Sequence, residues 1–170
     1  MTSLVLTVIA PDKPGLVELL SQTVAAHQGN WLESSMSRLA GKFAGILTVS
    51  VPQQQSEALI NALSELETQG LKVVAERSQE PEQSPAFSSI TLSLIGHDKQ
   101  GIVKEISQAL AANKVNVERL STELTSGSMS AEELFKAQAD LLVPTSVDLD
   151  DLQQSLEDIA SDLMVDITIN

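Results

Sequence analysis

The sequence predicts an α+β protein built from two similar units, each an antiparallel four-stranded sheet with two helices on one face. Three observations predict this class: an internal repeat, a βαββαβ order of strand-like and helix-like segments in each copy, and a linker-like stretch between the copies. Residues 4–16 read LVLTVIAPDKPGL and residues 90–102 read ITLSLIGHDKQGI, a constant offset of 86 positions. Because a repeat sets the domain count, we expect a first domain at 1–78, a linker at 79–87 and a second domain at 88–170.

Four strands are expected in the first copy, where β-branched and apolar residues follow strand-type patterns. They are predicted at residues 3–10, 30–39, 42–51 and 71–77. A turn at Ala40-Gly41 joins the two middle strands. The first helix follows Asp12, a candidate N-cap residue, and ends at Gly29 as its C′ residue. The second helix ends at Gly70, and its apolar positions are Leu59, Ile60, Leu63 and Leu66.

The second copy repeats this order with one insertion. Its strands are predicted at residues 88–96, 115–124, 134–143 and 163–169. Its first helix is expected at about 99–113, and its second helix carries Leu149, Leu152, Leu156 and Ile159. The offset between the copies rises from 86 to 92 before the third strand, so six residues have been gained within the polar stretch 125–133. Right-handed crossovers then give the strand order 4-1-3-2 in each sheet, which is the ferredoxin-like plan.

The composition excludes several classes of function. The net charge is −13 and the 10 Lys and Arg residues form no stripe, whereas nucleic-acid binding needs a basic footprint. Without cysteine the chain forms no disulfide and no thiolate metal site, and we expect neither a metal nor a cofactor. No run approaches the ~20 apolar residues of a membrane helix and no signal peptide opens the chain. We therefore expect a cytoplasmic protein that does not bind membranes.

The repeated turn between the first strand and the first helix of each copy is the candidate ligand site. Backbone N–H groups that open a helix lack internal partners and favour a carboxylate. The glycine before each helix removes a Cβ that would obstruct a ligand, and the aspartate can accept hydrogen bonds from an ammonium group. An asparagine at the start of the second strand is expected near the same end of the unit. The candidate ligand-binding residues are Ala10, Pro11, Asp12, Lys13, Pro14, Gly15, Leu16 and Asn30 in the first copy, and Gly96, His97, Asp98, Lys99, Gln100, Gly101, Ile102 and Asn116 in the second.

A purely structural interpretation of the same turn stays open. An aspartate before a helix often only caps it, and a glycine there can serve only a tight turn. His97 beside Asp98 could form an acid–base pair, but no nucleophile is placed with it. We therefore predict no catalytic residue and no enzymatic activity.

The Asp-Lys-x-Gly turn, the βαββαβ frame and the asparagine after the first helix resemble ACT domains, which are regulatory modules that bind small amino acids. The tandem pair, with a longer second copy that holds Ser126, Gly127, Leu134 and Phe135, is similar to the glycine cleavage system transcriptional repressor family. This resemblance implies a protein without its own DNA-binding domain that responds to glycine and acts through a DNA-binding regulatory protein. It also implies that ligands lie at 10–16 with Asn30 and at 96–102 with Asn116.

Two functions therefore follow from the sequence. The first is an amino-acid-responsive regulator of glycine metabolism that acts by protein–protein contact and possesses no DNA-binding domain. The alternative is a constitutive adaptor whose acidic surface docks a basic partner and whose turns are structural only. The sequence leaves open whether the chain forms a homodimer.

Overall fold

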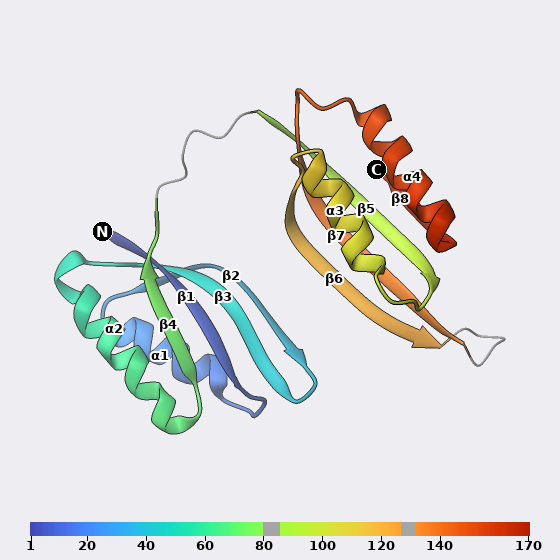
Figure 1. Cartoon of the computed structure of the whole chain (residues 1–170). Coiled ribbons are helices and arrows are strands. Elements are labelled where there is room, and N and C mark those ends of the chain that lie inside the picture. Colours follow the sequence, from blue (N-terminus) through green and yellow to red (C-terminus); the bar gives the residue numbers. More distant parts are fainter. Residues whose placement is uncertain (80–85, 127–131) are drawn as a thin grey trace. The chain divides into compact units, whose positions relative to one another are not determined.

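The structure is a computed structural model that describes residues 1–79, 86–126 and 132–170 (Figure 1). The chain divides into two compact units, Met1–Pro81 and Glu82–Asn170. Most of the predicted linker, residues 80–85, lies outside the described residues. The linker and the exact domain boundaries therefore stay a prediction.

The first unit has the predicted βαββαβ order and the predicted antiparallel sheet. Its elements are β1 (Thr2–Pro11), α1 (Leu16–Ala26), β2 (Asn30–Leu39), β3 (Lys42–Val51), α2 (Ser56–Glu65) and β4 (Lys72–Arg77). Short 3₁₀ turns at Gln53–Gln55 and Leu66–Gln69 flank α2. The strand order β2-β3-β1-β4 is the predicted 4-1-3-2 order counted from the other edge.

The second unit repeats this fold. Its elements are β5 (Phe87–His97), α3 (Ile102–Ala112), β6 (Asn116–Ser126), β7 (Glu133–Pro144), α4 (Leu149–Leu163) and β8 (Val165–Ile169). The strand order β6-β7-β5-β8 matches that of the first sheet. The long strands β6 and β7 take up both ends of the predicted insertion, and its middle, residues 127–131, lies outside the described residues. The predicted α+β fold of two such units is confirmed.

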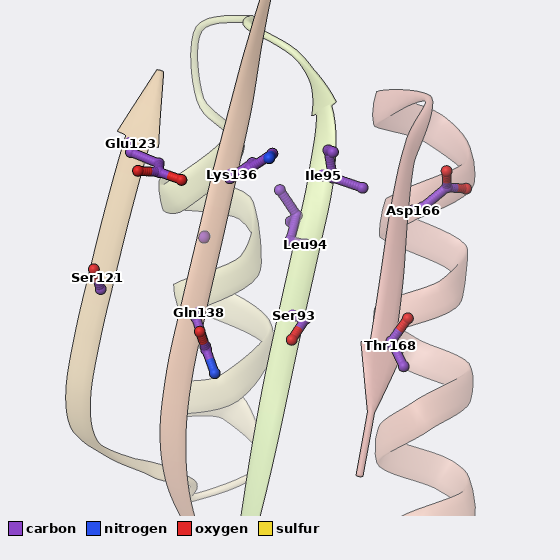
Figure 2. Close-up of a pocket in the computed structure, with 10 residues that line it drawn as sticks. Ser93, Leu94, Ile95, Ser121, Glu123, Lys136, Gln138, Asp166 and Thr168 are labelled. Carbon is purple, nitrogen blue, oxygen red and sulfur yellow. The ribbon is translucent and has the colours of Figure 1, made fainter. Parts of the chain in front are cut away.

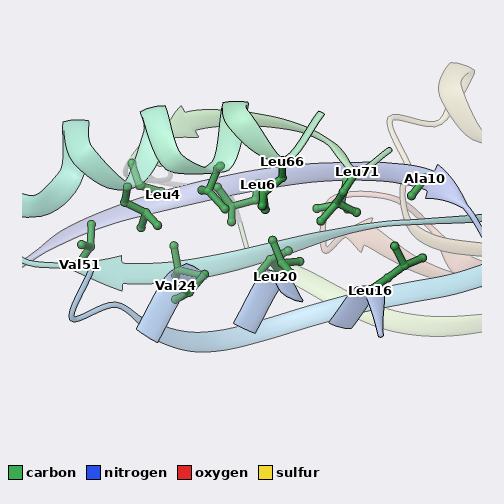
Figure 3. Close-up of a cluster of buried hydrophobic side chains, with 14 residues drawn as sticks. Leu4, Leu6, Ala10, Leu16, Leu20, Val24, Val51, Leu66 and Leu71 are labelled. Carbon is green, nitrogen blue, oxygen red and sulfur yellow. The ribbon is translucent and has the colours of Figure 1, made fainter. Parts of the chain in front are cut away.

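Each unit has its own aliphatic core between the sheet and its two helices. In the first unit every second side chain of β1 is buried, which is the period of a strand with one face covered. Leu16, Leu20 and Val24 of α1 close over that face (Figure 3). Leu59 and Leu63 of α2 are buried in the same core. The second core uses the matching positions of β5, α3 and α4, and its buried helix residues are Ile102, Ile106, Leu110, Leu152, Leu156 and Ala160.

The start of the first helix in each unit differs from the prediction. Asp12 does not cap α1; the N-cap residue is Gly15, in the left-handed region at φ 90°, and no side chain caps the helix. Gly101 holds the same place before α3 at φ 89°. Each helix therefore starts directly after a glycine, and α3 starts at Ile102 rather than near residue 99. A left-handed residue is favourable only for glycine, so the sequence did hold a signal for this boundary.

The end of α1 also differs from the prediction. The left-handed residue is Gln28 (φ 61°), not Gly29, and Lys114 (φ 59°) holds the same position after α3. The amide of Gly29 donates to the carbonyl of Val24 over 2.9 Å. A Cβ on Gly29 would lie 2.7 Å from Val24 Cγ1, so this glycine serves a close approach rather than a positive φ. The predicted glycine at Gly70 does adopt the left-handed region, at φ 88°.

In the part of the chain that the structure describes, no helix is both long enough and apolar enough to cross a membrane.

Candidate functional site

The two repeated turns leave the end of β1 and the end of β5 and lead into α1 and α3. Each is anchored by its first amide to the strand hairpin beside it. The N–H of Asp12 donates to the carbonyl of Gly41 over 2.9 Å, and the N–H of Asp98 donates to the carbonyl of Glu133 over 3.2 Å. These bonds fix each turn against the start of the third strand of its unit, while the turn residues themselves are exposed.

The helix starts behind these turns are open. The amide of Leu19 donates to the carbonyl of Gly15, and that of Glu105 to the carbonyl of Gly101, each over 2.9 Å. The amides before Leu19 and Glu105 thus have no acceptor within the helix, and no side chain caps either end. A Cβ built on Gly15 or Gly101 would meet no atom within 4 Å. A small anion can therefore approach both helix ends from solvent.

The lysine of the repeated motif has a structural role that the sequence analysis missed. Lys13 Nζ donates to the carbonyl of Gln69 over 3.0 Å, and Lys99 Nζ donates to the carbonyl of Leu163 over 3.1 Å. Both carbonyls lie at the C-terminal end of the second helical segment of their unit, where a cation also complements the helix dipole. Each lysine therefore connects the start of one helix to the end of the other.

The carboxylate of the first turn already has a cationic partner. Asp12 Oδ2 lies 3.4 Å from Nη1 of Arg38, which comes from the end of β2. The side chain of Arg38 is 74% exposed and that of Asp12 is 29% exposed. Such an exposed ion pair is weak, but it places a guanidinium beside the carboxylate of the first turn.

The second turn is more acidic and lies beside a wide hollow. The hollow has a volume of about 670 Å³, and its lining residues are His97, Asp98, Lys99, Glu132, Glu133 and Met164. His97 Nδ1 lies 3.0 Å from Oε2 of Glu132, so the imidazole faces the β7 end of the hollow rather than forming a pair with Asp98. The three carboxylates of Asp98, Glu132 and Glu133 outnumber the single ammonium of Lys99 in this lining, which favours a ligand with an ammonium group.

Four predicted site residues face the core or pack closely against a neighbouring strand. Ala10, Leu16 and Ile102 are 2%, 4% and 3% exposed. A Cβ on Gly96 would collide with Val165. Among these four, only the backbone amides of Leu16 and Ile102 are placed to bind a ligand at the turns.

The expectation that Asn30 and Asn116 lie near the turns is wrong within each unit. Asn30 pairs with Ser50, which pairs with Ser3 at the beginning of β1. The turn follows the other end of β1, about 25 Å away at the rise of a β-strand. Asn116 lies in the same way beside the beginning of β5. The reason is that α1 and α3 run back along the sheet, so the strand that follows each helix starts at the far end.

Two further residues at the turns were not predicted. Arg38 and Glu132 both come from the hairpin formed by the second and third strands of their units. The antiparallel register brings this hairpin to the turn, since Pro11 pairs with Lys42 in β3 and Leu39 pairs with Lys42 across the Ala40-Gly41 turn. Extending the predicted strand pairing to the ends of the strands would have placed both residues beside the turns.

Over the described residues, no group of three or more His, Cys, Asp or Glu side chains could hold a metal ion.

Comparisons with known proteins agree with the fold of the two units. One family model of the ACT domain matches residues 2–76, and a second ACT domain model matches residues 88–161. No curated protein sequence matches the chain.

Two crystal structures resemble the whole chain. One is of an unknown protein from Galdieria sulphuraria, with 25% identity and a TM-score of 0.84, covering 99% of this chain and 97% of that one. The other is of a protein provisionally assigned as a glycine cleavage system transcriptional repressor, with 20% identity and a TM-score of 0.69, covering 99% of this chain and 96% of that one. At this identity the second likeness shows the fold alone.

Proposed function

The chain belongs to the ACT domain family, as two ACT domains in tandem, and from this we propose that it is a regulatory protein that senses a small amino acid. The observation that carries the proposal is the pair of open helix starts behind Gly15 and Gly101. Both are uncapped by side chains and unobstructed for a small ligand. A carboxylate bound there would accept hydrogen bonds from the free amides.

The second turn is the stronger of the two sites in this proposal. The carboxylate of Asp98 lines a hollow with Glu132 and Glu133, where the ammonium of an amino acid finds several acceptors. In the first turn Arg38 lies within 3.4 Å of Asp12 and competes for that carboxylate. We expect the two turns to differ in affinity for this reason.

We propose glycine as the first effector to test, because the likeness of the fold to a provisional glycine cleavage repressor supports it. The readout of the sensor would be contact with a DNA-binding regulatory protein in the cytoplasm. A net charge of −13 with scattered lysine and arginine argues against direct contact with DNA. The ligand would act by binding two arrangements of the chain with different affinities.

Calorimetric titration of the full chain with glycine, serine and a panel of other amino acids tests the site. We expect heat with at least one of them, and roughly tenfold weaker binding in Asp98→Asn, which removes a charge-assisted acceptor. Asp12→Asn is the matched control, for which we expect a smaller effect because Arg38 already neutralises that carboxylate. Absence of heat with every amino acid, or equal binding by Asp98→Asn, would contradict the proposal.

Measuring partner binding with and without effector distinguishes the sensor hypothesis from the hypothesis of a constitutive adaptor. Affinity capture on the tagged chain, with and without the effector found by calorimetry, should change the amount of a DNA-binding protein retained. In Asp98→Asn that change should be lost while capture itself persists. Equal capture with and without effector in the unaltered chain would favour the adaptor.

A further inference from the structure

The outer face of the second sheet, which is turned away from α3 and α4, carries a polar hollow (Figure 2). All four strands of that sheet contribute to its lining, and its volume is about 360 Å³. A smaller hollow of about 180 Å³ continues it towards Arg119 and Asp140, since Ser121 and Gln138 line both. Neither hollow includes a residue of the repeated turns.

Strand register explains why this face is hollow. Side chains that share the outer face lie in parallel rows across the strands. The central row consists of Ser121, Gln138, Ser93 and Thr168. One flanking row consists of Glu123, Lys136, Ile95 and Asp166, and the other includes Arg119, Asp140 and Thr91. Short hydroxyl side chains thus form much of the floor, and longer charged side chains form the rims.

Within the described part of the chain, the charged side chains of the two flanking rows do not form ion pairs with one another. Over the described residues, Asp12 and Arg38 form an ion pair, and His97 Nδ1 lies 3.0 Å from Glu132 Oε2. Lys136 therefore makes no ion pair with Glu123 or Asp166, although all three share one row. The face offers a cation and carboxylates that remain available to a ligand.

The first unit provides an internal comparison at the same positions. Its outer face has Ala44 where the second unit has Lys136, and Lys72 where it has Asp166. In the central row, Ile46 and Val74 replace Gln138 and Thr168, and they are 57% and 47% exposed. The fold therefore does not require polar residues on this face, and the hollow with its charges is a property of the second unit.

We propose that this hollow binds a small zwitterion whose ammonium and carboxylate are several bonds apart, such as a dipeptide or an ω-amino acid. Lys136 would bind the carboxylate and Asp166 the ammonium, two strands away. With neighbouring strands about 4.8 Å apart, these two groups stand too far apart for an α-amino acid, whose charges flank a single carbon. The hydroxyls of Ser93 and Thr168 and the amide of Gln138 would bind the polar atoms between the charges.

Titration of the ¹⁵N-labelled full chain with diglycine, followed by NMR and calorimetry, tests this proposal. We expect shifts of amides in β5, β7 and β8, and the same strands should respond to ε-aminocaproate. Glycine and diglycine blocked at both ends should leave these strands unshifted, because neither carries two separated charges. Shifts caused equally by glycine, or no shift with diglycine, would overturn the proposal.

Substitutions then assign the two charges. Lys136→Met and Asp166→Asn should each weaken diglycine binding roughly tenfold, the effect of one charge-assisted hydrogen bond. Lys72→Met, at the matching position of the first unit, should bind diglycine as the unaltered chain does. Unchanged binding in Lys136→Met, or loss of binding in Lys72→Met, would refute the assignment. Preserved NMR spectra of each variant without ligand would show that it folds.

Discussion

At the scale of single residues, the backbone conformation of a few positions decides where the helices start and end. Gly15 and Gly101 start α1 and α3 from the left-handed region, where a Cβ is costly although there is space for it. Gly29 is the opposite case, with an ordinary φ and no space. The three glycines are thus required for different reasons. Alanine should destabilise the chain through backbone strain at Gly15 and Gly101 and through steric conflict at Gly29.

Alanine substitutions separate strain from steric conflict. Gly15→Ala and Gly101→Ala should each cost about 1 kcal/mol of unfolding free energy through the left-handed backbone alone. Gly29→Ala should cost about 1–3 kcal/mol, because its Cβ would press on Val24 inside the first core. Urea unfolding followed by circular dichroism measures all three. An equal cost at Gly15 and Gly29 would contradict this distinction.

Glycine should stabilise the chain where other residues adopt the left-handed region. Gln28 and Lys114 do so at the ends of α1 and α3, and a glycine there removes a conformational penalty of about 1 kcal/mol. We expect Gln28→Gly and Lys114→Gly to raise the unfolding free energy by about 0.5–1 kcal/mol each. Gln22→Gly, inside α1, is the control and should lower it by about 1 kcal/mol. A loss of stability in Gln28→Gly would show that the side chain matters more than its backbone.

At the scale of elements, the lysine of each turn links the start of the first helix to the end of the second. Lys13 Nζ binds the carbonyl of Gln69, and Lys99 Nζ binds that of Leu163. Neither α2 nor α4 has a basic residue in its own last turn. The cation that complements these helix ends therefore comes from the turn.

Removing these lysines should weaken the second helix of each unit. Lys13→Met and Lys99→Met keep the length of the side chain and should lower the unfolding free energy by about 0.5–1 kcal/mol. Hydrogen exchange should show the loss in the 3₁₀ turn Leu66–Gln69 that follows α2 and at the C-terminal end of α4. Lys72→Met is the control, since its side chain lies on the outer face of the first sheet. Unchanged exchange in the 3₁₀ turn Leu66–Gln69 in Lys13→Met would argue against the link.

The helices and strands are predictable from the sequence, whereas the contacts between them are predictable only in part. Alternating apolar residues such as Leu4 and Leu6 fixed the strands, and the repeat fixed their order. The lysine contacts were not predictable, because they join Lys13 and Lys99 to carbonyls 56 and 64 residues away. The prediction for Asn30 is wrong because Asn30 follows the end of the first helix, whereas the turn precedes the start of that helix.

At the scale of the whole molecule, the chain has two hydrophobic cores that share no residue. Trp31, the only tryptophan, packs against the first core. Its fluorescence therefore reports on the packing of the first core. Far-UV circular dichroism follows the helices of both units, so a transition seen there without a change in Trp31 fluorescence belongs to the second unit.

Core substitutions should affect the two units separately. Leu63→Ala, in the first core, should cost about 2–5 kcal/mol and shift the unfolding midpoint seen by Trp31 fluorescence. Leu152→Ala, in the second core, should cost a similar amount in circular dichroism and leave the fluorescence midpoint in place. A fluorescence midpoint that falls equally in both variants would show that the units unfold together.

Net charge acts on the molecule as a whole. With 23 acidic and 10 basic side chains, like charges repel one another across the folded chain, and salt screens that repulsion. We expect the melting temperature to rise when sodium chloride is increased from about 10 mM to about 200 mM. Scanning calorimetry measures it. A melting temperature that falls with salt would mean that specific ion pairs outweigh the net repulsion.

In each ACT domain the lysine contact connects the turn to the segment that precedes an edge strand of the sheet. The carbonyl that Lys13 holds lies just before β4, and the one that Lys99 holds lies just before β8. Both β4 and β8 are edge strands of their sheets. A ligand that displaced the turn would therefore also displace the first residues of an edge strand through the same lysine.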